Sequence, residues 1–294
     1  MTAPTPQTVI EILRRSTQYL RDHGSESARL DAELLCAHAL GMRRLDCYLQ
    51  FDRVLGTGEL TSIRDLLRRR GQGEPVAYLI GVREFYGRDF VVNPHVLVPR
   101  PDTEVLIETV VAWARDHSRG GAPIRIADIG TGSGCIAVTL AAEIEDAQVV
   151  AVDVSADALT VAGRNAGALG VAERITFAEG SWCEPLTGLP VFDVVVSNPP
   201  YITDAEMATL PRDVAGHEPK LALAAGADGL EPYRMLTASM PSVVRERSLV
   251  ALEIDPRRVD DVLALLRAAM PAADVVSVDD LTGRPRLCRA TIGG

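Results

Sequence analysis

The sequence Ile-Arg-Ile-Ala-Asp-Ile-Gly-Thr-Gly-Ser-Gly-Cys, residues 124–135, is an apolar run that passes directly into a glycine-rich turn. It predicts a buried strand at 124–129 and a helix over 134–145, where apolar residues recur at helical spacing. Glycine permits positive φ and close approach of a ligand, and the helix start offers free N–H groups. The spacing is G-x-G-x-G, not the G-x-G-x-x-G typical of dinucleotide sites. We therefore expect a ligand-binding turn here.

A second strand with a terminal acid follows this turn. Residues 149–153 read Val-Val-Ala-Val-Asp. Asp153 lies about 20 residues beyond the glycines, the distance at which an acid accepts hydrogen bonds from ribose hydroxyls. A tight turn followed by an unrelated surface Asp is the alternative, but the placement of the acid favours a nucleoside-binding βαβ unit.

The turn Asn198-Pro199-Pro200-Tyr201 comes directly after an apolar run at 192–197. That run predicts a buried parallel strand, whose ladder two consecutive prolines cannot continue because they lack N–H groups. The chain must turn at the carboxyl end of the strand, where open α/β sheets bind ligands. The Asn198 amide and the proline carbonyls offer a hydrogen-bonding cradle for a planar amide or an aminated ring. An ordinary turn is the simpler interpretation of these four residues alone.

Alternating strands and helices fill the chain from residue 102 on. Strands are expected at 124–129, 149–154, 175–179, 192–197 and 249–254, and helices at 102–117, 134–145, 156–169, 229–245 and 257–269. Two further strands, 275–278 and 286–292, flank a turn at 282–285. This order predicts an α/β fold with a mostly parallel, doubly wound sheet that ends in an antiparallel hairpin.

The N-terminal part has a different pattern. Apolar stripes at helical spacing within 9–20, 30–40, 45–49 and 60–67 predict a small bundle. The cluster Arg68-Arg69-Arg70 is interpreted as the solvated end of the last of these helices. Alternation around Gly87 predicts a hairpin. We therefore expect three parts: a helical bundle at 1–73, a linker with a β-hairpin at 74–100 and a catalytic domain at 101–294.

Composition and charge exclude several classes of protein. The 294-residue chain is 47% hydrophobic, but it has no unbroken apolar run of roughly 18 residues, so no membrane span is expected. Five scattered cysteines without a C-x-x-C pair and a polar N-terminus favour a cytoplasmic protein with reduced thiols and no metal site. Residues 1–75 carry eleven Arg and ten acidic residues, so the net charge of −10 leaves −11 on the rest. This acidity argues against broad contact with nucleic acid.

Further fragments accompany the two motifs, namely Phe85-Tyr86-Gly87, Val96-Leu97-Val98-Pro99-Arg100-Pro101-Asp102-Thr103-Glu104, Glu218-Pro219 and Gly226-Ala227-Asp228-Gly229-Leu230. With them, the chain resembles the HemK/PrmC family, the glutamine-N5 methyltransferases of peptide chain release factors. The resemblance implies a Rossmann-like class I methyltransferase domain, with a mostly parallel seven-stranded sheet and an antiparallel last strand, preceded by a small helical domain that recognises the substrate. It implies S-adenosyl-L-methionine as cofactor and S-adenosyl-L-homocysteine as product.

The resemblance also implies which residues bind the cofactor. The glycine turn would pack against its amino-acid and ribose parts, Asp153 would accept from the ribose hydroxyls, and Trp182 would offer an apolar face to adenine. Family members often carry an acid where this chain has Ser181, which can still accept a hydrogen bond. The implied set is Asp128, Gly130, Thr131, Gly132, Ser133, Gly134, Asp153, Val154, Ser181, Trp182 and Asn198.

The implied catalytic residues are Asn198, Pro199, Pro200 and Tyr201. The acceptor would be the glutamine of the GGQ motif in release factors 1 and 2, whose amide lone pair is delocalised into the carbonyl. The Asn198 side-chain oxygen and the Pro199 carbonyl would accept the two amide hydrogens, and Tyr201 would pack on the planar amide. Positioning and electrostatics would supply most of the rate. The methylation would modulate translation termination, and a monomer is expected.

Two other functions stay open. Asn-Pro-Pro-Tyr is shared with adenine-N6 methyltransferases of DNA or RNA, although the acidic balance and the lack of a basic recognition domain count against stable nucleic-acid binding. The second is a non-enzymatic methyltransferase-like binding module, against which the intact glycine turn, Asp153 and Asn-Pro-Pro-Tyr argue together. No membrane partner is expected.

Overall fold

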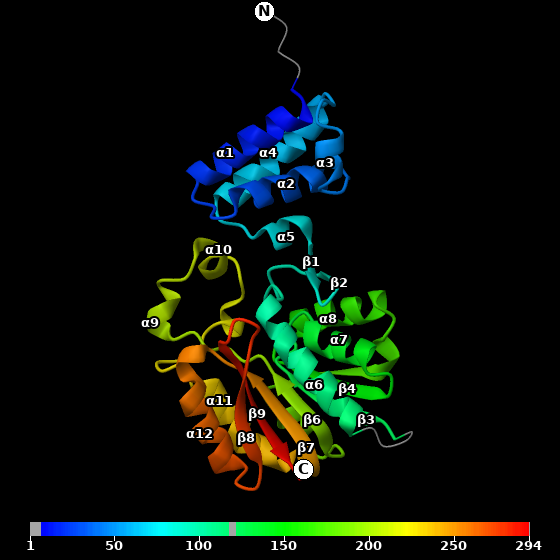
Figure 1. Ribbon diagram of the computed structural model, residues 1–294, viewed down its shortest axis with the longest axis vertical. Coiled ribbons are helices and arrows are strands. Elements are labelled where there is room, and N and C mark those ends of the chain that lie inside the picture. Colours follow the sequence, from blue (N-terminus) through cyan, green and yellow to red (C-terminus); the bar gives the residue numbers. More distant parts are fainter. Residues whose placement is uncertain (1–6, 118–121, 294) are drawn as a thin grey trace, which may run out of the picture. The chain divides into compact units, whose positions relative to one another are not determined.

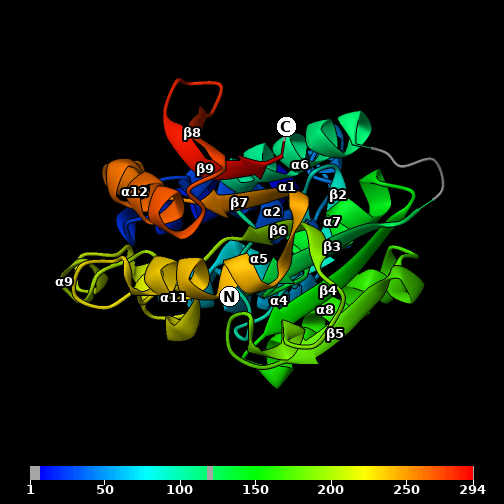
Figure 2. The same ribbon diagram turned by 90° about the horizontal axis from the view of Figure 1, so that it is seen from below.

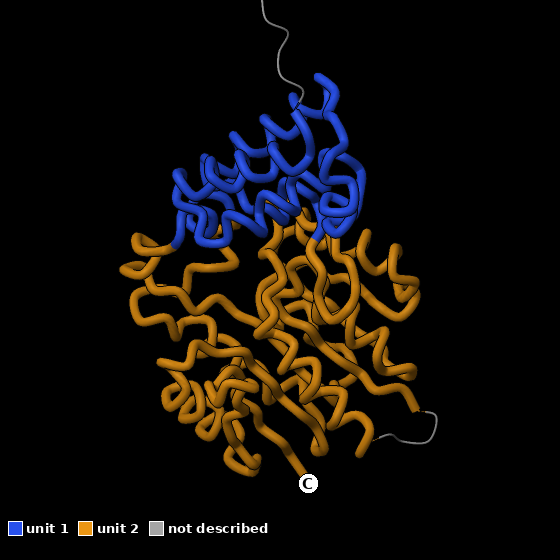
Figure 3. The backbone as a smooth tube through the Cα atoms, turned by 45° about the horizontal axis from the view of Figure 1, so that its top comes forward, with its two compact units in different colours: residues 1–82, 211–217 blue, residues 83–210, 218–294 orange. Residues whose placement is uncertain are grey.

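The computed structural model describes residues 7–117 and 122–293, and the chain forms two compact units. One comprises the residues up to Val82 together with Pro211–His217, and the other comprises Arg83–Leu210 with Glu218–Gly294 (Figure 3). The expected linker at 74–100 is therefore divided between the two units. In the described residues, no helix is long and apolar enough to cross a membrane.

The first unit is a small helical bundle. Its helices are α1 (Val9–Asp22), α2 (Ala28–Ala39), α3 (Asp46–Leu49), α4 (Thr57–Gly71), α5 (Val76–Ile80) and α10 (Arg212–Ala215) (Figure 1). Leu20, Leu35 and Ile63, from α1, α2 and α4, are fully buried in one core. The four helices expected in this region are confirmed. The additional α5 and α10, each preceded by a proline, are too short to produce an apolar stripe.

Arg70 is not solvated, although the cluster Arg68-Arg69-Arg70 was expected to form a solvated helix end. Its Nε lies 2.8 Å from Oδ2 of Asp31 on α2, and its Nη1 lies 3.2 Å from Oδ2 of Asp213. Only 11% of the Arg70 side chain is exposed. The expectation is wrong for this residue because α4 packs against α2 on the side from which Arg70 projects.

The second unit is built on a seven-stranded sheet in the order β5-β4-β3-β6-β7-β9-β8 (Figure 1). The strands are β3 (Ile124–Ile129), β4 (Ala147–Asp153), β5 (Ile175–Glu179), β6 (Phe192–Ser197), β7 (Val244–Glu253), β8 (Asp274–Asp279) and β9 (Pro285–Ile292). The first five pair in parallel, whereas β9 runs antiparallel to both β7 and β8. The predicted fold class is confirmed, and the carboxyl ends of β3, β4, β5 and β6 meet at one edge.

Two helical layers cover the sheet (Figure 2). The helices α6 (Glu104–Asp116), α7 (Cys135–Glu143) and α8 (Ala156–Ala168) pack on the face that includes Ile126, Val149 and Val194. The helices α11 (Glu231–Ser239) and α12 (Val259–Ala269) pack on the face that includes Ala127 and Val150. Because successive residues point to opposite faces, a strand with both faces covered has consecutive apolar residues, as Val194, Val195 and Val196 show.

The hairpin of β1 (Val82–Phe85) and β2 (Arg88–Val91) confirms the alternation expected around Gly87. Tyr86 and Gly87 both have positive φ, +50° and +70°, the conformation of a type I′ turn. Phe85 and Phe90 are fully buried in the core shared with α6 and α7, with ring centroids 6.0 Å apart. This burial explains why the hairpin from Arg83 on belongs to the second unit.

The structure corrects one helix boundary. A helix was expected over 229–245, but α11 ends at Ser239, a short 3-10 turn covers Met240–Ser242, and β7 begins at Val244. Pro241 lacks an N–H group and cannot continue the helical ladder. The strand therefore starts earlier than the apolar run at 249–254 indicates. Two of its first four residues are exposed.

Candidate active site

A cavity of about 570 Å³ lies at the carboxyl ends of β3, β4, β5 and β6. This volume suits a ligand of the size of a nucleoside derivative. Most of the predicted site residues line it, namely Gly130, Thr131, Gly132, Ser133, Asp153, Val154, Ser181, Trp182, Asn198 and Pro200. Four predicted residues are not in its wall: Asp128, Gly134, Pro199 and Tyr201.

The glycine turn after β3 forms the floor of the cavity. Gly130, Gly132 and Gly134 have φ of +76°, +55° and +79°, which L side chains rarely adopt. A Cβ on Gly130 or Gly132 would meet nothing within 4 Å, whereas one on Gly134 would lie 3.0 Å from the Cβ of Ala162 on α8. Gly130 and Gly132 therefore leave open space for a ligand at this side of the cavity, and Gly134 allows α8 to pack closely.

Asp153 holds the turn and also lines the cavity. Its Oδ2 accepts a hydrogen bond from the Gly132 N–H at 2.8 Å, and its Oδ1 accepts from the Ser155 N–H at 2.9 Å. Each carboxylate oxygen has a further lone pair that can accept from a ligand hydroxyl. Beside it, Val154 is 56% exposed in the cavity wall, so an acid and an apolar surface lie next to each other.

Asp128 lies beneath the turn and is fully buried. Its Oδ2 accepts from the Thr131 hydroxyl at 2.7 Å and from the Ala137 N–H at 3.1 Å. Burial raises the pKa of Asp128 to about 7, against the effect of these two hydrogen bonds. The side chain thus supports the turn from below, and a direct contact with the cofactor stays a prediction.

Ser181 and Trp182 follow β5 and border the cavity on the side of Val154. Trp182 has φ of +50°, a strained conformation for an aromatic residue. Its ring packs against the second hydrophobic core, and the Gly180 N–H donates to the Asp153 carbonyl at 3.0 Å. These contacts help to hold the strained conformation, in which Trp182 lines the cavity.

Asn198 stands in the opposite wall, at the end of β6. Its Nδ2 donates to the Thr103 hydroxyl at 3.2 Å, and the preceding Ser197 hydroxyl donates to the Ile129 carbonyl at 2.6 Å, which ties β6 to β3. Burial raises the pKa of Tyr201 to about 12, so its phenol is neutral. The role of Thr103 was missed, although the residue belongs to the Pro-Arg-Pro-x-Thr-Glu segment quoted for the family resemblance.

Two segments complete the wall near Asn198. They supply His95, Val96, Leu97, Pro99 and Arg100 on one side and Pro219, Lys220, Leu221, Ala222, Ala224 and Ala225 on the other. The buried Glu218 joins them, because its Oε2 accepts from the Val98 N–H at 3.2 Å and its Oε1 pairs with the Arg100 guanidinium. Both segments belong to the fragments that carry the family resemblance, and the structure brings them to the cavity.

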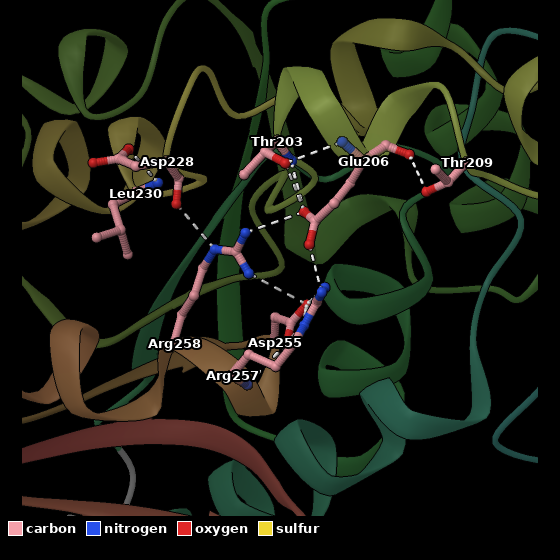
Figure 4. Close-up of polar contacts among 8 residues, drawn as sticks. All are labelled: Thr203, Glu206, Thr209, Asp228, Leu230, Asp255, Arg257 and Arg258. Carbon is pink, nitrogen blue, oxygen red and sulfur yellow. Dashed lines mark hydrogen bonds and ion pairs between the residues drawn. The ribbon is translucent and has the colours of Figure 1, made fainter.

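A network of ion pairs fastens the loop that follows Tyr201 (Figure 4). Glu206, on α9 (Asp204–Met207), accepts from Arg258 Nη2 at 3.1 Å and pairs with Arg257. Arg258 Nε also donates to the Asp228 carbonyl at 3.1 Å, and its Nη1 lies 3.6 Å from Oδ2 of Asp255. The network therefore connects three loops, those at α9, at 226–230 and after β7.

Comparisons with known proteins cover both units. The model of the PrmC N-terminal domain matches residues 11–81, and that of the methyltransferase small domain matches residues 102–213. A release factor glutamine methyltransferase of Nitratidesulfovibrio vulgaris is 41% identical over 95% of this chain and 93% of its own length. Proteins of the same name from Chlorobaculum tepidum and Geobacter sulfurreducens are 42% and 39% identical, over 93% and 99% of both chains.

Proposed function

Because the chain belongs to the family of release factor glutamine methyltransferases, we propose that it methylates the side-chain amide nitrogen (N5) of the glutamine in the GGQ motif of peptide chain release factors. The observation that carries this proposal is the position of Asn198. Its side chain stands in the wall of the cavity, and its amide nitrogen is hydrogen-bonded to Thr103. Its amide oxygen is then available to a hydrogen-bond donor, which is what an acceptor amide presents.

The residues at the carboxyl ends of β3, β4 and β5 suit S-adenosyl-L-methionine. This cofactor, when bound, supplies an electrophilic methyl group on a sulfonium. The bare floor at Gly130 and Gly132 admits its amino-acid part, and Asp153 would accept from its ribose hydroxyls. Val154 and Trp182 would contact the adenine ring, and the Ser181 hydroxyl would replace the acid that often serves there.

The chain's own residues would act on the acceptor mainly by positioning it. Asn198 Oδ1 and the Pro199 carbonyl would accept the two hydrogens of the glutamine amide and aim its nitrogen into the cavity. The neutral Tyr201 phenol and Pro200 would border the planar amide. An amide nitrogen is a weak nucleophile, so a fixed geometry and favourable electrostatics contribute most of the rate increase.

The proposal extends to the substrates of the enzyme, its cellular role and its oligomeric state. The substrates would be release factors 1 and 2, recognised in part by the helical unit, and the methylation would modulate translation termination in the cytoplasm. A substrate of this size is consistent with a monomeric enzyme. The net charge of −10 disfavours stable binding of nucleic acid.

A methyl-transfer assay tests the proposal. The purified chain and methyl-labelled cofactor are offered separately to an unmodified release factor, to the same factor with the GGQ glutamine changed to Ala, and to duplex DNA. Mass spectrometry then locates the label. We expect label on the GGQ glutamine and on neither control. Label on DNA adenine alone would contradict the acceptor and favour the adenine-N6 alternative, which uses the same turn.

A further inference from the structure

Lys220 is the one lysine among the 30 lysine and arginine residues of the sequence, and it stands in the wall of the candidate site. It is exposed, and its side chain makes no hydrogen bond or ion pair with any residue that the structure describes. Arg100, the arginine of the same wall, is by contrast paired with the buried Glu218. The Lys220 ammonium therefore keeps its three donors for a ligand.

The next residue, Leu221, adds an apolar side chain to the same wall. It is 73% exposed, although it lines a cavity. Covering an exposed leucine with a ligand removes apolar surface from water, which stabilises the complex. A cation with open donors and an exposed apolar side chain thus lie next to each other at the candidate site.

The main chain around these two residues is held in place. Lys220–Ala222 form a 3-10 turn, and the Ala224 N–H donates to the Lys220 carbonyl at 2.9 Å. Before the turn, Oε2 of Glu218 accepts from the Val98 N–H at 3.2 Å. A fixed main chain lowers the entropy lost when a ligand binds, so this turn is suited to recognition.

The turn is connected to the acceptor side of the site. Ile202, which directly follows Tyr201, donates its N–H to the Leu223 carbonyl at 3.0 Å and accepts from the Ala225 N–H at 2.8 Å. The segment after Lys220 therefore pairs with the backbone that continues the Asn-Pro-Pro-Tyr turn. Most residues expected to bind the cofactor instead follow β3, β4 and β5.

We propose that Lys220 and Leu221 form the subsite for the substrate segment that carries the acceptor glutamine. This inference rests on the proposed function. The Lys220 ammonium donates to peptide carbonyls of that segment, and Leu221 packs on its backbone. The glycines of the GGQ motif have no side chains, so their main chain can approach both residues closely. A compact ammonium on a flexible stem suits carbonyls at varied angles, whereas a guanidinium is a rigid fork that matches carboxylates.

Two variants test the subsite by kinetics. Lys220→Met keeps an apolar stem but removes the ammonium, and Leu221→Ser removes most of the apolar surface. Each should raise KM for the release factor by roughly tenfold. The value of kcat at saturating factor and the cofactor affinity measured by calorimetry should change little, because the lost contacts are equal in the ground state and the transition state.

Leu281→Ser is the matched control. Leu281 is also exposed, in the turn between β8 and β9, but it does not line the cavity. This variant should leave KM for the factor, kcat and cofactor affinity unchanged. Both Lys220 and Leu221 are exposed, so their substitution should not prevent folding.

Acetylation of Lys220 provides a readout besides activity, since no other lysine side chain of this sequence reacts. The wild-type protein is treated with an amine-acetylating reagent alone, with S-adenosyl-L-homocysteine, and with S-adenosyl-L-homocysteine plus saturating release factor. Mass spectrometry follows the peptide that contains Lys220. We expect the release factor to slow its acetylation several-fold and the cofactor product alone to have little effect.

A wild-type KM for the factor in either variant, or unchanged acetylation in the presence of the factor, would overturn the inference. It would also be overturned if S-adenosyl-L-homocysteine alone protected Lys220 and Lys220→Met weakened cofactor binding, because the ammonium would then bind the cofactor carboxylate. Failure of the wild-type chain to methylate any release factor would instead overturn the proposed function.

Discussion

Arg258 Nη2 lies 3.1 Å from Oε2 of Glu206, although 52 residues separate them in the chain. The Arg258 side chain is 10% exposed and also binds the Asp228 carbonyl, so one guanidinium holds the loop after Asn-Pro-Pro-Tyr against the loop at 226–230. The neighbouring pair of Arg234 with Asp228 is half exposed on both sides. Two ion pairs that share a loop thus differ in burial, and their contributions to stability should differ accordingly.

Arg258→Ala should destabilise the second unit by about 1 to 3 kcal/mol, because it removes the buried guanidinium that binds both Glu206 and the Asp228 carbonyl. Urea denaturation followed by tryptophan fluorescence measures this change. Arg234→Ala, the matched control on the exposed pair, should have little effect. If the two variants lost equal stability, the buried Arg258 guanidinium would not be what holds these two loops together.

Gly229→Ala should be more harmful than an alanine at Gly283. Both glycines have positive φ, +75° and +77°, so both substitutions carry the same backbone strain of about 1 kcal/mol. At Gly229 the new Cβ would also lie 2.3 Å from Arg258 Nε, whereas at Gly283 it would meet nothing within 4 Å. Thermal unfolding of the two variants measures the difference, and a smaller loss at Gly229 would contradict the close approach of Arg258.

Asn198→Ala should reduce methylation of a release factor by at least roughly a hundredfold, the effect of losing one positioned polar group. Cofactor affinity, measured by calorimetry, should stay within a few-fold, because the residues expected to bind the cofactor lie mainly at the ends of the other strands. Near-normal turnover would disprove the role assigned to Asn198. A large loss of cofactor affinity would place its main contribution in cofactor binding.

Asp128→Asn should change how stability depends on pH. The pKa of Asp128 is raised to about 7 in the folded protein from 3.8, so the folded state binds the proton more tightly than the unfolded state. The favourable contribution of Asp128 is complete below its unfolded pKa and is lost as the pH rises toward 7. Asn keeps an acceptor for Thr131 and Ala137 but cannot ionise. Relative to that of the wild type, the free energy of unfolding of the variant should therefore rise by about 1 to 3 kcal/mol between pH 5 and pH 8.

Denaturant titrations at both pH values test this expectation. A difference in unfolding free energy that does not change with pH would show that Asp128 is ionised in the folded protein throughout this range. The same constant difference would result if the hydrogen bonds lowered the pKa of Asp128, because the carboxyl group would then be ionised in both states above pH 5.

Much of the fold could be predicted from local sequence. The runs at 124–129 and 192–197 are mostly apolar because both faces of these strands are covered, and each is followed by residues that favour a turn. Asp153 and Asn198 could be placed at one edge of the sheet, since parallel strands end on the same side. The short helices α5, α9 and α10 could not be predicted, because so few residues show no periodicity.

The sequence by itself determined the order of strands and helices, the glycine turn, the acid at the end of β4 and the amide that follows β6. These features depend on neighbouring residues, whose spacing and conformational preferences are visible in the chain. Only the tertiary structure brought Thr103 and Asn198 together and buried Arg70 against Asp31. Contacts between segments far apart in the chain depend on how helices and strands pack, and packing leaves no periodic pattern in any one segment.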